Sequence, residues 1–238
     1  MNETFSQPLV SVIVPVLNAA RFLGDALASV DAQTYAPFEV IVVDGPSTDE
    51  TPRIAQSFAR VRYMQQSGVG MWNAVNEGMD AARGEFVAMI SSDDLWDENK
   101  LQLQVEYLRD HPDTRHVFGL TKFVLIEGET PPRAFRTELF HGEHLAILLE
   151  SLLARKTLFE RVGRFDETFR MASDVDWFAR LENLHEPRGV IPRVLTYKRI
   201  HAHNLSSEPT LSKTFNHELL AMMRAQVLRQ RAGSVQDE

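Results

Sequence analysis

The chain has 238 residues, a formal net charge of −8 and no cysteine. This length suits one α/β domain or two small ones, and a hydrophobic content of 44% is enough to form a core. The lack of cysteine excludes disulfides, thiolate metal sites and a cysteine nucleophile, and the acidic balance argues against a nucleic-acid partner. No apolar run is long enough to span a membrane and the first residues do not resemble a signal peptide, so we expect a cytoplasmic protein.

Strand and helix signals alternate through the first hundred residues. Apolar, β-branched runs predict strands, whereas amphipathic spacing of apolar side chains predicts helices. The expected strands are 9–17, 38–44, 61–65 and 86–90, and the helices between them cover about 21–33, 49–59 and 71–83. This alternation predicts a doubly wound α/β fold with a mostly parallel sheet flanked by helices.

The second half of the chain is less regular. Helical patterns cover 101–111, 145–153, 171–181 and about 212–231, and strand patterns cover 117–126 and 190–200. One face of the last helix is apolar and its other residues include Arg224, Arg229 and Arg231. We expect this helix to pack on its own domain or on a second copy of the chain, with contact to a membrane surface as the alternative.

Carboxylates stand where two of the predicted strands end. Asp93 and Asp94 follow the run from Phe86 to Ile90, and Asp44 ends the strand 38–44. In open α/β sheets, ligands bind outside the carboxyl ends of the strands, and carboxylates at this edge suit Mg²⁺ or Mn²⁺. The alternative is purely structural: Asp93 and Asp94 would cap the next helix, and Asp44 would bind its own loop.

Two further pairs of polar side chains are candidates. Asn73 and Asn76 lie one helical turn apart and either face one pocket or point to solvent. Asp174 and Asp176 lie in the first turn of the predicted helix 171–181. The helix dipole favours carboxylates at that position, so a structural explanation stands beside a catalytic one.

Five stretches in this order resemble the inverting glycosyltransferases of family two, which have the GT-A fold, and the resemblance covers about residues 8–206. The strand Val12-Ile-Val-Pro-Val-Leu-Asn18 resembles the family's opening strand, although Leu17 replaces its tyrosine. The segments 42–51 and 68–84 resemble the next two signatures. Ser92-Asp93-Asp94 stands at the position of the Asp-x-Asp metal motif, with Ser91 and Ser92 preceding the pair where many relatives carry another acid. Residues 171–181 resemble the catalytic helix, with Ser173 in place of a glutamate.

The resemblance implies a role for each matching residue. It implies a donor site for a UDP-, GDP- or dTDP-linked sugar, with Asp44 recognising the base and Asp93 contacting the ribose or the sugar. Asp94 would bind Mg²⁺ or Mn²⁺, with His201 near the metal or the diphosphate. Asp174 would be the general base, with Asp176 as its neighbour. The other expected donor-site residues are Pro15, Asn18, Asn73, Asn76 and Ser92.

The same resemblance divides the chain into three parts. Residues 8–97 would bind the nucleotide sugar, residues 98–206 would bind the acceptor and carry out catalysis in the same domain, and residues 207–238 would be a helical tail. The acceptor would be a saccharide or a lipid-linked saccharide in cell-surface polysaccharide or glycolipid assembly. Such a protein would be cytoplasmic, with peripheral contact to the inner face of the membrane and a homodimer through the tail as further expectations.

Two other functions share the expected α/β architecture. A sugar-phosphate nucleotidyltransferase would carry a Gly-rich, basic loop after its first strand, where this chain has Pro15-Val-Leu-Asn18. A non-catalytic sugar-nucleotide-binding protein would not need Asp94, Asp174 and Asp176 together. The sequence therefore favours a metal-dependent inverting glycosyltransferase.

Overall fold

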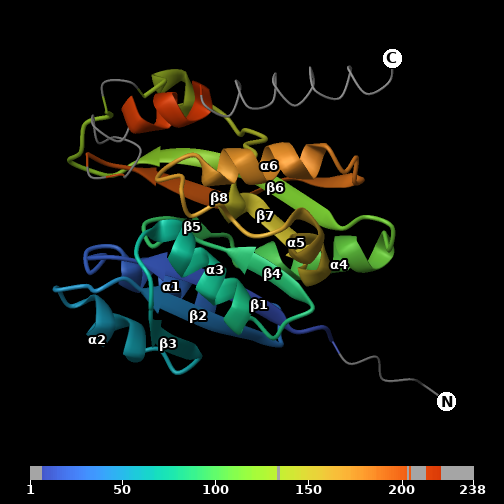
Figure 1. Ribbon diagram of the computed structural model, residues 1–238, viewed down its shortest axis with the longest axis horizontal. Coiled ribbons are helices and arrows are strands. Elements are labelled where there is room, and N and C mark those ends of the chain that lie inside the picture. The colour runs from blue at the N-terminus through green and yellow to red at the C-terminus, as the bar shows by residue number, and fades with distance from the viewer. Residues whose placement is uncertain (1–6, 133–134, 203, 205–212, 221–238) are drawn as a thin grey trace.

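A single eight-stranded sheet organises the molecule, and its strand order is β3-β2-β1-β4-β7-β6-β8-β5 (Figure 1). The computed structural model describes residues 7–132, 135–202, 204 and 213–220. The strands are β1 (Val10–Val16), β2 (Phe38–Asp44), β3 (Val61–Gln65), β4 (Phe86–Met89), β5 (Leu95–Trp96), β6 (His116–Leu125), β7 (Leu152–Arg155) and β8 (Arg188–Ile200).

Helices cover both faces of this sheet. The named helices are α1 (Leu23–Asp31), α2 (Thr51–Gln56), α3 (Met71–Ala81), α4 (Lys100–Asp110), α5 (Lys156–Val162) and α6 (Ser173–Glu182), with short 3-10 turns at Thr137–Phe140 and Leu149–Ser151. Apolar side chains of α1, α2 and α4 belong to one buried cluster, and those of α3, α5 and α6 belong to the other. Residues of β1 alternate between the two clusters, so its β-branched sequence is buried on both sides.

The first half of the chain forms a parallel sheet, as the alternating pattern predicts. β1 lies between β2 and β4, and β2 pairs with β3, all in parallel register. Their carboxyl ends therefore meet at one edge, where Asp44 and the segment after β4 are found. Close packing of α3 on β1 depends on Gly78, because a Cβ at this position would lie 2.5 Å from the side chain of Ile13.

The second half extends the sheet with mixed directions. β7 runs antiparallel to both β4 and β6, whereas β6 and β8 are parallel and β5 is antiparallel to β8. The sheet is thus mostly parallel, and the predicted α/β class is confirmed.

The helix predicted over 145–153 is wrong. The structure has a 3-10 turn at Leu149–Ser151 that leads directly into β7. Leu152, Leu153 and Ala154 are fully or almost fully buried between β4 and β6. A short apolar run that is buried on both sides fits a strand as well as a helix, and pairing with two neighbouring strands decides the outcome.

A short helix over 213–220 is the described part of the helix predicted over 212–231. It is the red segment above β8 in Figure 1. The remainder of that prediction lies outside the described residues. Within the part of the chain that the structure describes, no helix has both the length and the apolar character needed to cross a bilayer.

Candidate active site

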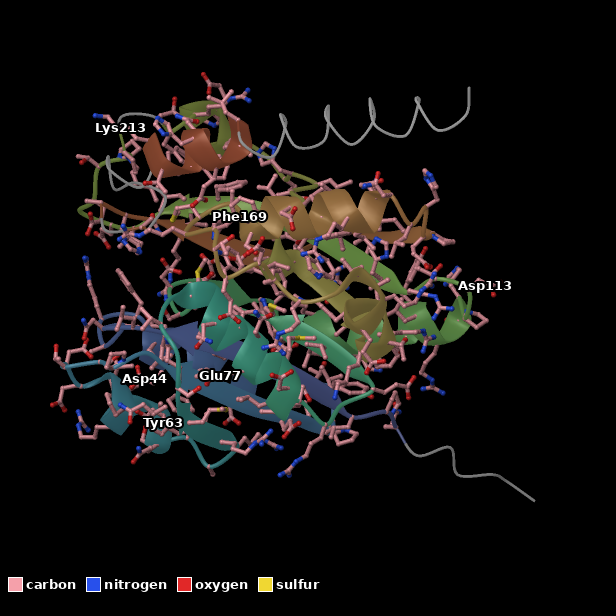
Figure 2. The ribbon with its side chains drawn as sticks, viewed as in Figure 1. Asp44, Tyr63, Glu77, Asp113, Phe169 and Lys213 are labelled. Carbon is pink, nitrogen blue, oxygen red and sulfur yellow. The ribbon has the colours of Figure 1, made fainter. Side chains whose placement is uncertain are left out.

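The carboxylate of Asp44 lies at the carboxyl end of β2 and is almost fully buried. Ser47 Oγ donates to its Oδ1 at 2.5 Å, and the phenol of Tyr63 donates to its Oδ2 at 2.7 Å. Figure 2 shows Asp44 and Tyr63 together at this end of the sheet. Burial and the hydrogen bond to Asp44 raise the pKa of Tyr63 to about 12, so the phenol remains a donor at neutral pH. Asp44 is therefore held in a fixed orientation by two hydroxyl groups.

The loops that follow β1 and β2 are tied together beside Asp44. Asn18 adopts a left-handed backbone conformation with φ 48°, which asparagine tolerates better than most residues. Its side-chain oxygen accepts the Thr48 N–H at 2.9 Å, and its own N–H donates to Ser47 Oγ at 2.8 Å. Pro15 lies in β1 opposite Val43 of β2. The predicted donor-site residues Pro15, Asn18 and Asp44 thus belong to one edge of the sheet.

The segment Ser91-Ser92-Asp93-Asp94 is a tight turn between β4 and β5. The Asp94 N–H donates to the Ser91 carbonyl at 3.2 Å, and Ser92 is partly buried within the turn. The chain then enters β5, which pairs with Thr196 and Tyr197 of β8. The next helix starts only at Lys100, so the structural alternative in which the aspartates cap that helix is wrong.

Asp94 points into the protein interior and has protein partners on both oxygens. Its Oδ1 accepts the Arg199 backbone N–H at 3.0 Å, and its Oδ2 accepts from Lys198 Nζ at 2.9 Å. The side chain is fully buried, and burial raises the pKa of Asp94 to about 7 although the Lys198 ammonium opposes this shift. These partners fit a structural carboxylate better than the predicted cation ligand.

Glu150 is the second carboxylate that binds Lys198. Its Oε1 lies 3.2 Å from Lys198 Nζ and accepts from Ser91 Oγ at 2.5 Å. Burial opposes ionisation of Glu150, but the Lys198 charge and the Ser91 hydroxyl hold its pKa below the usual value. Asp94 and Glu150 in turn hold the pKa of Lys198 well above its usual value against the effect of burial. The ammonium of Lys198 thus binds two buried carboxylates, those of Asp94 and Glu150.

Asp93 has different partners and meets the residues that follow β8. Its Oδ2 lies 3.2 Å from His201 Nε2 and accepts from Asn204 Nδ2 at 3.0 Å. Burial opposes ionisation of Asp93, but the His201 hydrogen bond and the Lys198 charge hold its pKa below the usual value. Asp93 and His201 are 108 residues apart in the sequence, and the fold brings them together at the sheet edge.

Asp93 and His201 form a donor pair that suits a divalent cation. Mg²⁺ is commonly bound by one or two carboxylates together with substrate phosphates, and imidazole with carboxylate also suits other divalent metals. Among the described residues, no group of three or more His, Asp or Glu side chains is arranged to hold a metal ion. A cation at Asp93 and His201 would therefore need its remaining ligands from substrate and water.

Asp174 and Asp176 differ in their partners although both lie in the first turn of α6. Asp176 forms an ion pair with Arg180 at 2.8 Å, and Arg180 also donates to the carbonyls of Val162 and Arg164. Among the bonds of the described residues, Asp174 accepts backbone N–H groups only, and that of Val175 lies at 2.9 Å. It has no side-chain partner there, which leaves the carboxylate available to a substrate.

The pKa of Asp174 is shifted in the direction that suits a base. Burial raises it to about 6; the Val175 N–H opposes this shift and the Glu150 carboxylate adds to it. A general base works best when its pKa lies near the operating pH. The electrostatic influence of Glu150 and Lys198 on Asp174 also shows that the start of α6 lies near the strand-end carboxylates.

Asn73 and Asn76 are brought together, but they bind another part of the protein. Both amides donate to Glu167, at 3.1 and 2.8 Å. Asn76 is buried and also exchanges hydrogen bonds with the backbone of Phe165. The two asparagines therefore fix the segment between α5 and α6. Their expected role in donor binding stays a prediction, and these contacts do not support it.

Several residues of the site are not identified from the sequence alone. Glu150 lies in the stretch wrongly predicted as helix. The sequence therefore does not indicate that this residue stands just before β7, at the edge of the sheet. Lys198 and Arg199 carry a signal that a closer reading can use, because basic residues stand at the end of a predicted strand just before His201. Tyr63 lies between Arg62 and Met64 in β3, and this sequence context gives no such signal.

Comparison with known proteins shows the family to which the chain belongs. The model of glycosyl transferase family 2 matches residues 11–132. An uncharacterized glycosyltransferase of Rickettsia prowazekii is 32% identical over 218 residues, which is 85% of this chain and 67% of that protein. A second one, from Rickettsia typhi, is 33% identical over 192 residues, or 75% of this chain and 60% of that protein. The chain thus spans about two thirds of the length of these relatives.

Solved structures show the same architecture. The 1–349 segment of Staphylococcus aureus TarS in complex with UDP aligns with a TM-score of 0.64 and 22% identity over 81% of this chain and 61% of that chain. The mannosyltransferase PcManGT from Pyrobaculum calidifontis, in complex with GDP-Man and Mn²⁺, aligns with a TM-score of 0.60 and 27% identity over 82% of this chain and 57% of that chain.

The fold and the family match define a glycosyltransferase domain of the GT-A type. Within that class, the family match over half of the sequence and the similarity to the rickettsial proteins show that this chain belongs to glycosyl transferase family 2.

Proposed function

We propose that this protein transfers a sugar from a nucleoside-diphosphate sugar to a hydroxyl acceptor in one displacement with inversion. The observation that carries the proposal is the position of Asp174, a partly buried carboxylate that has no side-chain partner among the described residues and lies near the cluster formed by Asp94, Glu150 and Lys198. A carboxylate with a pKa of about 6 is ionised at neutral pH. It can therefore accept the proton of the acceptor hydroxyl as that oxygen attacks the sugar.

The donor would lie along the edge that contains Asp44. The oxygens of Asp44 accept from Ser47 and Tyr63, and a remaining lone pair of this carboxylate would accept a ring N–H of the base. The neighbouring Asn18 loop would line the same part of the donor site. Two similar structures bind UDP and GDP-Man, which supports a nucleotide-sugar donor.

The diphosphate would be bound at Asp93 and His201 through Mg²⁺ or Mn²⁺. We assign this role to Asp93 and not to Asp94, because both oxygens of Asp94 are bound by Lys198 and the Arg199 backbone. When bound, such a cation stabilises the negative charge that develops on the leaving diphosphate. The likeness to a mannosyltransferase with bound Mn²⁺ supports the use of a divalent metal.

The remaining residues of the cluster would hold the reacting groups in place. Lys198 would offset part of the negative charge of Asp94 and Glu150, and Asp176 is occupied by Arg180, so Asp174 would be the available base in the first turn of α6. The acceptor hydroxyl would approach from the side of α6. A saccharide or lipid-linked acceptor in cell-surface polysaccharide assembly is the biological role that we propose for this chemistry.

Thermal unfolding with a panel of nucleotides and nucleotide sugars, each with and without Mn²⁺, tests the donor site. A ligand that binds only the native protein raises the midpoint. We expect a cation-dependent rise with one base, which disappears in Asp93→Ala and persists in Asp176→Asn. No rise with any nucleotide would refute the donor site.

Product analysis tests the reaction itself. We expect release of a nucleoside diphosphate and a product whose anomeric configuration is opposite to that of the donor. Release of pyrophosphate would instead identify a sugar-phosphate nucleotidyltransferase. Binding without turnover, over a panel of saccharide acceptors, would favour a non-catalytic sugar-nucleotide-binding protein.

A further inference from the structure

One carboxylate connects the helix 213–220 to the start of α6. Glu218 Oε1 accepts the Arg170 N–H at 2.6 Å, and Oε2 accepts the N–H groups of Met171 and Ala172 at 2.9 and 2.8 Å. Figure 2 labels Phe169, which directly precedes these three amides, and Lys213, the first described residue of the helix. A single side chain from the C-terminal segment thus binds three successive backbone amides in the catalytic half.

The chemistry of this contact is that of a helix cap supplied from elsewhere in the chain. The residue at the cap position of α6 is Ala172, which makes no side-chain capping bond. The N-terminal end of a helix carries partial positive charge and favours an anion. Hydrogen bonds to an ionised acceptor are also stronger than those between neutral groups. Glu218 supplies the capping acceptor that Ala172 cannot provide.

A second carboxylate, Glu167, fixes the beginning of the segment that leads from α5 to α6. Glu167 accepts from Asn73 and Asn76 of α3, and Asn76 also binds the backbone of Phe165. The segment 165–172, which leads from α5 to α6, is therefore fixed to the body of the domain at its beginning and to the helix 213–220 at its end. The second anchor lies two residues before Asp174.

We infer that Glu218 is a positioning residue, which holds the start of α6 so that Asp174 meets the acceptor hydroxyl. This inference rests on the proposed function of Asp174 as the base. Small displacements of a catalytic group, on the order of 1 Å, can reduce the rate about 100-fold. The contact would thus make the C-terminal segment part of the catalytic half of the domain.

The test compares Glu218→Ala and Glu218→Gln with the control His217→Ala, a change at the exposed neighbouring position on the same helix. Amide hydrogen exchange measures whether the N–H groups of 170–172 are held. We expect faster exchange at these amides in Glu218→Ala, an intermediate effect in Glu218→Gln, whose amide oxygen still accepts, and no change in the control.

Kinetics then separate positioning from folding. We expect kcat of Glu218→Ala to fall about 10- to 100-fold, with the KM for the donor and the nucleotide-induced rise in melting midpoint unchanged. Unchanged amide exchange, or faster exchange with an unchanged or increased kcat, would overturn the inference. Failure of the proposed function can be distinguished from failure of this inference. If the proposed function is wrong, the wild-type protein transfers no sugar, whatever the amide exchange shows.

Discussion

Asp174→Asn should remove activity and at the same time stabilise the protein. The substitution keeps the shape of the side chain and removes its ability to accept a proton, which general-base catalysis requires. We expect transfer to fall by roughly 10²- to 10⁴-fold, with the binding of the nucleotide sugar nearly intact. In the wild-type protein, kcat should decrease as the pH falls through about 6, because Asp174 becomes protonated.

The gain in stability follows from the same shift. Burial raises the pKa of Asp174 from 3.8 to about 6, and each unit corresponds to about 1.4 kcal/mol. Between about pH 4 and pH 6 the folded protein binds more protons at this position than the unfolded chain, so stability decreases as the pH rises. Above this range the ionised Asp174 costs the folded state about 3 kcal/mol. The asparagine variant lacks this cost.

Thermal and urea unfolding at several pH values provide the assay. At neutral pH we expect the midpoint of Asp174→Asn to exceed that of the wild type by roughly 6–12 °C, and the difference should vanish as the pH approaches 4. Asp176→Asn is the matched control, since it removes the ion pair with Arg180 and should leave stability unchanged or slightly reduced. Near-wild-type turnover, or no gain in stability at neutral pH, would refute the reasoning.

Three further changes test other parts of the structure. Lys198→Met leaves buried carboxylates without their cation, so the free energy of unfolding should decrease by about 3–5 kcal/mol in urea titrations, and a loss below 1 kcal/mol would contradict the ion pair with Asp94. Gly78→Val forces a side chain against Ile13 and should cost at least about 1–3 kcal/mol, measured in the same way. Asn76→Ala should reduce stability by about 1–3 kcal/mol without changing the nucleotide-induced shift in melting midpoint, and a loss of that shift would return Asn76 to the donor site.

The sequence predicts the parallel half of the sheet well because its signals are local. β2 and β3 have the predicted bounds, and the polar residues after β2 and β4 mark the edge at which Asp44 and Asp93 are found. Such signals depend on alternation and chain order alone. The mixed half depends on pairing between distant strands, which explains why β7 resembles a helix in sequence and is a strand in the structure.

The roles of Asp93 and Asp94 could not be predicted for a related reason. Asp93 and Asp94 are chemically identical neighbours, and only the fold shows that Lys198 occupies one while His201 contacts the other. The difference between Asp174 and Asp176 is local, because Arg180, four residues after Asp176 on the same helix, occupies the second of them. Sequence spacing identifies the pairs, whereas the partners of Asp93 and Asp94 come from residues about a hundred positions away.

The two-residue strand β5 has a consequence for the synthesis of this protein. Its pairing with Thr196 and Tyr197 brings the turn of Asp93 to the chain that continues into His201. Contacts over such long sequence separations form late, because a large loop must close first. A growing chain can therefore assemble β1 to β4 on the ribosome, but the Asp93–His201 pair arises only after β8 has emerged. Premature termination before β8 would leave a chain that lacks this pair.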